Sequence, residues 1–221
     1  MTAEDSSIEA LGALADPVRR ALYRHVADAP QETGRDAAAA AAGVSRSLAA
    51  FHLDKLVDAG LLAVSYRRPA GRGGPGAGRP AKLYRRADTE IAVALPPRAY
   101  GEAGRLLAEV VERAGLDHQL QAAARTAGEA ERPSDLPAAL RERGYAPYPD
   151  GEVLRLRNCP FHALADEFPA LVCGMNLALL QGLAGEEWAP AMDPGADGCC
   201  VSLTRCGPSA GPRPDSKNNN H

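Results

Sequence analysis

The chain has 221 residues, enough for one large domain or two small ones, and its net charge is −3. Residues 16–86 nevertheless carry 13 basic and 6 acidic side chains, a net of +7, so the rest of the chain is acidic. A basic first third indicates a polyanionic partner for that part alone. No apolar run of about 18 residues predicts a membrane span, and the acidic N-terminus lacks the pattern of a signal peptide. We therefore expect a cytoplasmic protein with no membrane partner.

The first predicted elements are helices with recognisable ends. One helix begins at Pro17 after an N-cap at Asp16. An alanine-rich helix follows and ends at Gly43, and a further helix begins after Ser45 as N-cap and ends at Gly60. The three-residue connection GVS between the last two helices is typical of a helix-turn-helix.

Two short strands, LLAVSYR and AKLYRR, are predicted next, separated by a loop rich in Gly, Pro and Arg. A helix-turn-helix followed by a β-hairpin with a basic tip is a winged helix. In such a domain the second helix enters the major groove of DNA with its N-terminal residues near the base edges.

The expected DNA contacts come from this second helix and from the wing. Arg46 suits a bidentate contact to guanine. The other polar side chains suit phosphates, bases or the minor groove, and they are Ser45, Ser47, His52, Lys55, Arg67, Arg68, Arg72 and Arg79. The alternative is a solvated basic face on an ordinary helical domain, or a winged helix that docks onto protein.

Residues 98–114 predict an amphipathic helix. Its apolar side chains share one face and are Tyr100, Ala103, Leu107, Val110, Val111 and Ala114. We interpret this segment as a dimer helix; the alternative is that it packs only within its own chain.

A resemblance covers residues 8–90. LGALADPVRRALYRHV and VSRSLAAFHLDKLVDAGLL, with GRPAKLYRR after them, resemble the ArsR/DeoR-like bacterial regulators. The resemblance implies a homodimeric winged helix that binds a near-palindromic operator. Arsenic-sensing ArsR proteins carry cysteines in the helix-turn-helix, whereas this chain has none before Cys159, so that mode of sensing is excluded.

The remainder predicts a smaller module with a strand in EVLRLRNC, a buried helix in PALVCGMNLALLQGLAG and a last strand in CCVSLTR. The predicted fold is therefore mainly α with small β elements (α+β). We divide it into a winged helix-turn-helix domain at 1–90, a helical dimerisation segment at 91–133, a small α/β cysteine-containing sensor module at 134–207 and a disordered tail at 208–221.

Four of the five cysteines lie in that module, and we expect no disulfide framework in a reducing compartment. Cys159 lies at a bend and Cys173 on a helix, whereas Cys199 and Cys200 open a strand whose alternation turns only one of them inward. Spaced single thiols, with His162 three residues after Cys159, favour an iron–sulfur cluster over a hard ion. Zinc in the same ligands, or thiols that only pack in a core, are the alternatives.

A second resemblance concerns this module. RERGYAPYPDGEVLRLRN, NCPFHALADEFPALVC and DGCCVSL resemble the C-terminal part of SufR-type iron–sulfur repressors. The resemblance implies Cys159, Cys173 and one of Cys199 and Cys200 as cluster ligands, with Cys200 preferred. Some members carry a further cysteine where this chain has LRLRN, so the fourth ligand stays open between His162 and the second thiol of the 199/200 pair.

The sequence thus predicts a homodimeric DNA-binding transcriptional regulator, a repressor, whose operator affinity is controlled by a cysteine-ligated iron–sulfur cluster. One alternative is the same regulator with a structural or sensed zinc ion. Another is a C-terminal module that binds a small molecule or a protein without metal. We expect no enzyme activity, since the sequence has no phosphate loop, no GxSxG motif and no nucleophile with an evident base.

Overall fold

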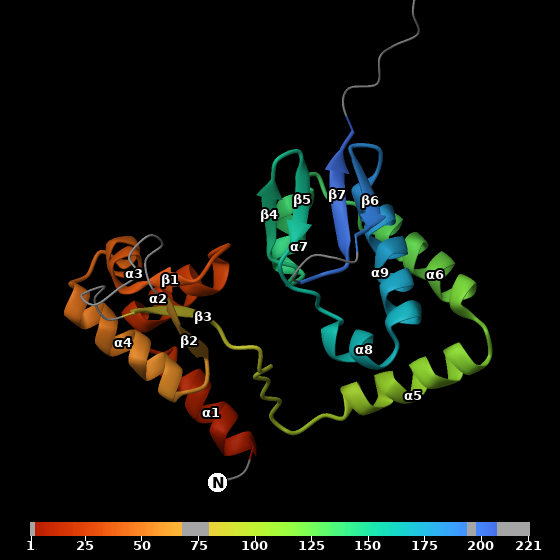
Figure 1. The fold of residues 1–221 in the computed structure, drawn as a ribbon. Coiled ribbons are helices and arrows are strands. Elements are labelled where there is room, and N and C mark those ends of the chain that lie inside the picture. Colours follow the sequence, from red (N-terminus) through yellow and green to blue (C-terminus); the bar gives the residue numbers. More distant parts are fainter. Residues whose placement is uncertain (1–2, 68–79, 194–197, 207–221) are drawn as a thin grey trace, which may run out of the picture. The chain divides into compact units, whose positions relative to one another are not determined.

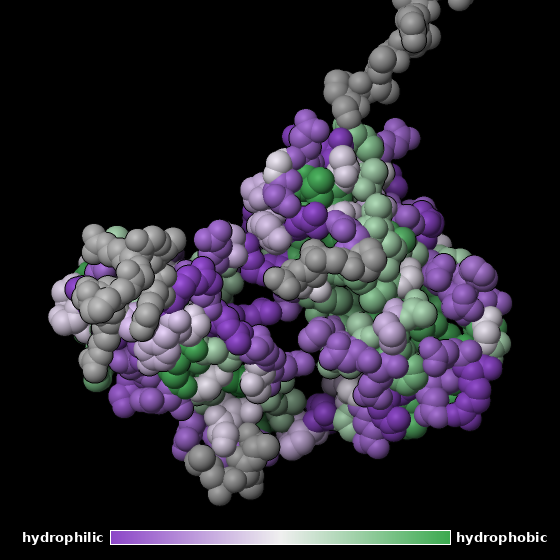
Figure 2. All heavy atoms as spheres, viewed as in Figure 1, coloured by the Kyte–Doolittle hydropathy of each residue, from purple (hydrophilic) through white to green (hydrophobic). Residues whose placement is uncertain are grey.

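The computed structural model describes residues 3–67, 80–193 and 198–206 (Figure 1). The chain divides into two compact units, Met1–Arg98 and Ala99–His221, here called the N-terminal and C-terminal units. On the face drawn in Figure 2, hydrophilic residues cover most of the surface of each unit, and hydrophobic residues form smaller areas between them. No helix in the described ranges is long and apolar enough to cross a membrane.

The N-terminal unit is a set of helices with one small sheet. Its elements are α1 (Ala3–Ala13), α2 (Pro17–Asp28), β1 (Thr33–Gly34), α3 (Arg35–Ala42), α4 (Arg46–Asp58), β2 (Leu62–Arg67) and β3 (Ala81–Arg86). The sheet has the order β1-β3-β2 and is antiparallel throughout. Buried side chains from the helices, including Leu22, Leu53 and Leu56, pack with the fully buried Tyr84 of β3.

Local chemistry sets the helix ends in this unit. The side chain of Asp16 accepts a hydrogen bond from the Arg19 N–H at 2.9 Å, and α2 begins at the next residue, Pro17. Ser45 Oγ accepts from the Leu48 N–H at 3.3 Å at the start of α4. Gly43 ends α3 with φ 65°, a left-handed conformation that suits glycine. These three predicted ends are confirmed.

The predicted hairpin is also present. β2 and β3 pair from Leu62 opposite Arg86 to Arg67 opposite Ala81. The predicted wing contacts Arg68, Arg72 and Arg79 lie outside the described residues.

The C-terminal unit combines helices with a four-stranded antiparallel sheet of order β4-β5-β7-β6. Its elements are α5 (Tyr100–Arg113), α6 (Asp117–Ala130), α7 (Leu136–Glu142), β4 (Pro147–Asp150), β5 (Val153–Leu156), α8 (His162–Glu167), α9 (Pro169–Ala184), β6 (Trp188–Met192) and β7 (Val201–Arg205). Helix α9 supplies Leu180 and Leu183 to the core beneath the sheet, where they meet Leu156 and Leu203. The predicted mainly helical α+β class is confirmed at this level.

Three strands were not predicted: the two-residue β1, and two strands that contain proline. β4 has Pro147 and Pro149, and β6 has Pro190. Both strands lie at the edges of the sheet, which is where proline is tolerated, since an edge strand can do without some ladder donors. From the sequence alone, a proline in a short apolar run argues against a strand, because the sequence does not show whether that strand lies at the edge of its sheet. The helices α1 and α8 were not predicted either.

Helix α6 runs along α9, and glycine lets their backbones touch (Figure 1). A Cβ on Gly128 would lie 2.3 Å from the Leu179 carbonyl oxygen, and a Cβ on Gly182 would lie 2.3 Å from the Arg125 carbonyl oxygen. No side chain fits at this crossing. The polar helix α6 is therefore fixed to the apolar helix α9 by direct backbone approach.

We predict that Gly128→Ala destabilises the C-terminal unit, because the added methyl group meets backbone that cannot rotate away. Over-packing of this kind costs about 1–3 kcal/mol, more than the roughly 1 kcal/mol that alanine gains over glycine in a helix. The control is Gly104→Ala in α5, where a Cβ meets nothing within 4 Å. The midpoint of thermal unfolding should fall for Gly128→Ala and rise for Gly104→Ala. Equal midpoints would contradict the close backbone contact between α6 and α9.

Candidate DNA-binding surface and cysteine cluster

The start of α4 presents the residues predicted to meet DNA. Ser45, Arg46 and Ser47 are all exposed. Ser45 Oγ caps the helix and lies 3.2 Å from Ser47 Oγ, so the two hydroxyls form one polar patch. The Arg46 side chain is 70 % exposed, and its Nε lies 2.8 Å from Asp36 Oδ1 in the first turn of α3.

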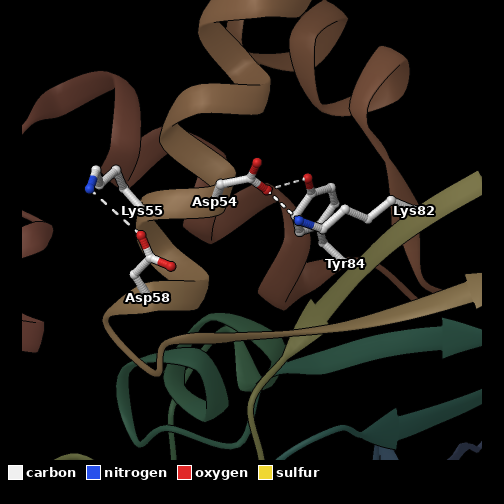
Figure 3. Close-up of polar contacts among 5 residues, drawn as sticks. All are labelled: Asp54, Lys55, Asp58, Lys82 and Tyr84. Atoms are coloured by element: carbon white, nitrogen blue, oxygen red, sulfur yellow. Dashed lines mark hydrogen bonds and ion pairs between the residues drawn. The ribbon is translucent and has the colours of Figure 1, made fainter.

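Two further predicted contacts also carry an acidic neighbour. Arg67 Nη2 at the end of β2 lies 2.9 Å from Glu32 Oε2, and the arginine side chain is 71 % exposed. Lys55 is half-exposed, with its Nζ 3.6 Å from Asp58 Oδ2 (Figure 3). Lys55 and Asp58 are both exposed, and pairs of that type contribute roughly 0–1 kcal/mol, so a phosphate can replace Asp58 at small cost. Glu32 is only 20 % exposed, so its pairing with Arg67 is less open to exchange.

The structure does not support His52 as a contact to the DNA backbone. Its side chain lies on the inward face of α4 with Ala49, Leu53 and Leu56, and the residue is 7 % exposed. The ring stands edge-on to Phe51, which is exposed in its place. Positions 49, 52, 53 and 56 share one helix face, so histidine follows the apolar residues inward.

One carboxylate ties α4 to the wing. Asp54 Oδ1 accepts hydrogen bonds from Lys82 Nζ at 2.6 Å and from the Tyr84 hydroxyl at 2.8 Å (Figure 3). Both donors come from β3, and the Tyr84 ring is fully buried. The Arg35 guanidinium at the start of α3 interacts with the same phenol, which raises the pKa of Arg35. Asp54 thereby joins α4 to β3, and Tyr84 extends the network to Arg35 of α3.

Electrostatics keeps this network ionised. Burial alone raises the pKa of Asp54, but the hydrogen bonds from Lys82 and Tyr84 outweigh it and leave that pKa below its ordinary value. The hydrogen bond to Asp54 likewise raises the pKa of Lys82. The stabilisation from Asp54 is complete above the ordinary carboxyl pKa and is lost as pH falls through the lower folded value. That from Lys82 is complete below its ordinary pKa and is lost as pH rises through the raised folded value.

A groove of about 750 Å³ opens beside this network. It lies among α3, the start of α4, β2 and the start of β3, and is lined by Gly34, Arg35, Asp36, Arg46, Tyr66, Pro80, Ala81 and Lys82. Three cationic side chains line it, and Tyr66 is exposed. Arg35, Lys82 and Tyr66 are candidate DNA contacts that were not predicted from the sequence. The basic flank of the second predicted strand was the available signal for Lys82.

In the C-terminal unit, four thiols from three segments come together. Cys159 follows β5, Cys173 lies in α9, and Cys199 and Cys200 lie just before β7. The thiols of Cys159 and Cys199 lie close enough to affect each other's pKa, and so do those of Cys173 and Cys200. Cys173 and Cys200 also raise the pKa of Cys159, although by less than Cys199 lowers it. We call these four residues the cysteine cluster.

Gly198 holds the Cys199–Cys200 turn against the end of β5. Its φ is 117°, and a Cβ there would lie 2.6 Å from the Leu156 carbonyl oxygen. The Cys199 N–H donates to that same oxygen at 2.9 Å. Because both cysteines precede β7 and follow no strand alternation, both thiols face the cluster. The expectation that only one of them turns inward is wrong.

A buried polar chain ends on the cluster. The Tyr145 hydroxyl donates to Asn176 Oδ1 at 2.6 Å, and Asn176 Nδ2 donates to Cys199 Sγ at 3.3 Å. Both Tyr145 and Asn176 are 1 % exposed. Buried polar groups are costly unless they are paired, so this chain fixes the position of Cys199. The lone Asn in the apolar stretch LVCGMNLALL was the signal by which sequence reasoning could have found it.

The thiols are not equivalent. The hydrogen bond from Cys199 lowers the pKa of Cys159 despite burial, with help from the Phe161 N–H. Burial, then the hydrogen bond with Cys200, raises the pKa of Cys173 to about 12. The hydrogen bond with Cys159, then burial, raises the pKa of Cys199. Cys159 is therefore the cysteine most readily ionised of these three.

The structure does not bring His162 to the cluster. Its side chain is 69 % exposed, and its Nδ1 lies 3.5 Å from Asp166 Oδ1 one turn along α8. Position 162 begins α8, while Cys159 lies ahead of that helix, so the two residues do not share a helical face. Among the described residues, no three His, Cys, Asp or Glu side chains converge closely enough to hold a metal ion as they stand.

We predict that Asp54→Ala lowers the free energy of unfolding by about 1–2 kcal/mol at neutral pH. The change leaves the buried Tyr84 hydroxyl without its acceptor, and the estimate is reduced because the Asp54 side chain is 49 % exposed. Asp58→Ala, on the exposed side of the same helix, should change it by less than about 0.5 kcal/mol. In urea unfolding, the difference between wild type and Asp54→Ala should shrink in acid, below the ordinary carboxyl pKa of 3.8. A pH-independent difference contradicts the ionised network.

Comparison with known proteins supports the first of these two sites. A family model described as a helix-turn-helix domain matches residues 14–65, which span α2, α3, α4 and most of β2. No curated protein and no solved structure gave a match. The matched residues include the exposed start of α4 and Asp54, whereas its partners Lys82 and Tyr84 lie beyond the match. The chain thus carries a helix-turn-helix domain, and this supports a DNA-binding transcription regulator.

Proposed function

We propose that the protein is a homodimeric cytoplasmic repressor whose affinity for operator DNA is controlled by an iron–sulfur cluster on the cysteine cluster. The observation that carries the proposal is the meeting of four thiols from three separate segments, in a chain that also has a helix-turn-helix domain. Thiols that only fill a core have no need to gather in this way.

The donor set suits the proposed cofactor. Iron–sulfur clusters are held by four cysteine thiolates, and soft sulfur ligands select such clusters or zinc over hard ions. Cys199 takes the place for which His162 was a candidate, so the proposed ligands are Cys159, Cys173, Cys199 and Cys200. As they stand in the described structure, no three of these side chains converge closely enough to hold a metal ion, so binding would require them to move together. When bound, the cofactor would link these three segments to one another, and that link would be sensitive to oxygen and to redox state.

A path from the cysteine cluster to α5 runs through Phe161. The Phe161 N–H interacts with the Cys159 thiol, and its side chain packs against two core groups at once. One group contains Tyr145 and Cys199; the other contains Ala108 of α5. Helix α8, which begins at the next residue, packs against both α5 and α9. Because binding energy at such sites is also folding energy, cofactor loss would loosen α8 and with it the support of α5.

The proposed dimer forms through α5. In the described structure Ala108 and Val111 of this helix pack inward, whereas Tyr100, Leu107 and Val110 are 78 %, 68 % and 62 % exposed. A second copy of the chain is the occupant we propose for this apolar face, because a two-fold operator is read by two recognition helices at a fixed spacing. A change in α5 would then change that spacing.

We predict that the double variant Leu107→Glu, Val110→Glu is a folded monomer with weakened operator binding. Both side chains are exposed within one chain, so charge there disturbs the interface and not the core. Ile8→Glu, Leu11→Glu in α1 is the control, since those side chains are 45 % and 44 % exposed. Light scattering after gel filtration reports the mass. If the α1 variant is a monomer and the α5 variant remains a dimer, the dimer interface lies on α1 and the proposal is wrong.

We predict that the chain purified without oxygen is brown and contains iron and acid-labile sulfide. Single Cys→Ser changes at 159, 173, 199 and 200 should each reduce the iron content. His162→Ala and Cys206→Ser should not, because His162 pairs with Asp166 and Cys206 is exposed. The measurement is visible absorbance with iron and zinc analysis. Colourless protein with stoichiometric zinc supports the zinc alternative, and protein with no metal rejects metal control.

A hollow in the C-terminal unit favours a second candidate function, small-molecule binding without metal. It measures about 770 Å³, and its lining includes Trp188, Arg205, Leu154 and Pro149. The Arg205 guanidinium lies 5.7 Å from the centre of the Trp188 ring. Its size is within the usual range of ligand pockets, about 300–1,000 Å³. Trp188→Ala should then abolish the response of DNA binding to the small molecule, in protein that contains no metal.

A further inference from the structure

Asp36 and Arg46 form a contact whose geometry differs from that of the other exposed ion pairs near the expected DNA surface. Asp36 Oδ1 lies 2.8 Å from Arg46 Nε, the nitrogen within the side chain. In the comparable pair on the wing strand, Glu32 meets Arg67 through Nη2, a terminal nitrogen. A guanine read by a bidentate arginine occupies two N–H groups at one edge of the guanidinium. The Asp36 contact leaves the edge formed by Nη1 and Nη2 to the base, whereas the Glu32 contact competes for a terminal nitrogen.

The Asp36–Arg46 ion pair itself contributes little to folding, although Asp36 lies in the first turn of α3, where a carboxylate favours the helix. The two side chains are 77 % and 70 % exposed, and such pairs contribute little to folding. Both side chains line the groove of about 750 Å³ that Lys82 and Tyr66 also line. A carboxylate on this surface repels the phosphates of any duplex, regardless of sequence. Its presence is therefore a cost for general DNA affinity, and needs a compensating effect on sequence preference.

We propose that Asp36 is a specificity-determining residue that positions Arg46 for base recognition. Its carboxylate accepts from Nε and fixes the plane of the guanidinium, so that the Nη edge is aligned before DNA arrives. Its negative charge lowers the affinity for every sequence equally. The two effects together increase the ratio of specific to non-specific binding. This inference rests on the proposed DNA-binding function, and it is independent of the metal and of the dimer interface.

The two effects separate in matched variants of the full-length protein. Asp36→Asn removes the charge but keeps an oxygen that can accept from Nε. Asp36→Ala removes both the charge and the acceptor. Glu32→Ala removes one negative charge beside the other predicted DNA-contacting arginine and leaves Arg46 untouched. Asp36 is exposed and lies in the first turn of α3, so both variants should lower the unfolding midpoint only slightly and by similar amounts.

The experiment selects bound duplexes from a pool with a randomised core, sequences them, and then measures Kd for the wild-type consensus and for a random duplex at one salt concentration. Asp36→Asn and Glu32→Ala should tighten binding to both duplexes by the same factor and keep the consensus. Asp36→Ala should also bind the random duplex more tightly. Its preference for the consensus, measured as the Kd for the random duplex divided by the Kd for the consensus, should fall about tenfold, because a bidentate pair contributes discrimination of that order. The loss should fall on one guanine position in each half-site.

An unchanged ratio and consensus for Asp36→Ala would overturn the inference and reduce Asp36 to a screening charge. An equal loss of ratio in Asp36→Asn would overturn it as well, since the acceptor oxygen would then be irrelevant. If the wild-type chain enriches no sequence from the pool, the proposed regulator function fails, and this inference falls with it. If the wild-type chain enriches a sequence and the Asp36 variants keep the same preference, this inference is wrong and the proposed regulator function still holds.

Discussion

The geometry of the DNA-binding surface depends on the carboxylate of Asp54. A helix-turn-helix reads DNA only if its second helix is held at a fixed angle to the neighbouring wing. Buried side chains such as Leu53 and Leu56 pack one face of α4 into the core. Asp54 adds a direct polar link to the wing, because it accepts from both Lys82 and Tyr84 of β3. The buried Tyr84 ring makes the contact obligatory, since its hydroxyl would otherwise lose its acceptor. The start of α4 is thereby presented to solvent in one orientation.

A different constraint acts in the C-terminal unit. The backbone contact at Gly128 and Gly182 fixes α6 along α9, and α9 carries both Cys173 and Asn176. The opposite wall of the cysteine cluster comes from the ends of the central strands β5 and β7. The cluster thus lies where a rigid helix pair meets the sheet, and Phe161 is the side chain shared with the packing under α5. A chemical change at the thiols therefore has a short physical route to the exposed apolar face of α5.

The sequence predicted the elements whose limits are set by local chemistry. Asp16, Ser45 and Gly43 act on backbone groups within a few residues, so their roles could be inferred without any tertiary information. His52 was misplaced because helical spacing alone did not tell whether a polar residue beside Ala49 and Leu53 would follow them inward. The proline-containing edge strands, and the inward orientation of both Cys199 and Cys200, depend on neighbours distant in the sequence. The Asp54 network was missed for the same reason, since its donors lie 28 and 30 residues away.

The most direct measurement is the Kd of the full-length protein, purified without oxygen, for a duplex that it selects itself, before and after removal of the bound metal by a chelator. If the cysteine cluster controls the helix-turn-helix domain, the two Kd values should differ at least tenfold, and the Cys199→Ser variant should give a single value with or without chelator. Phosphate contacts should make both values rise steeply with salt. Identical Kd values for the metal-loaded and metal-free protein, at every salt concentration, would contradict control of DNA binding by these thiols.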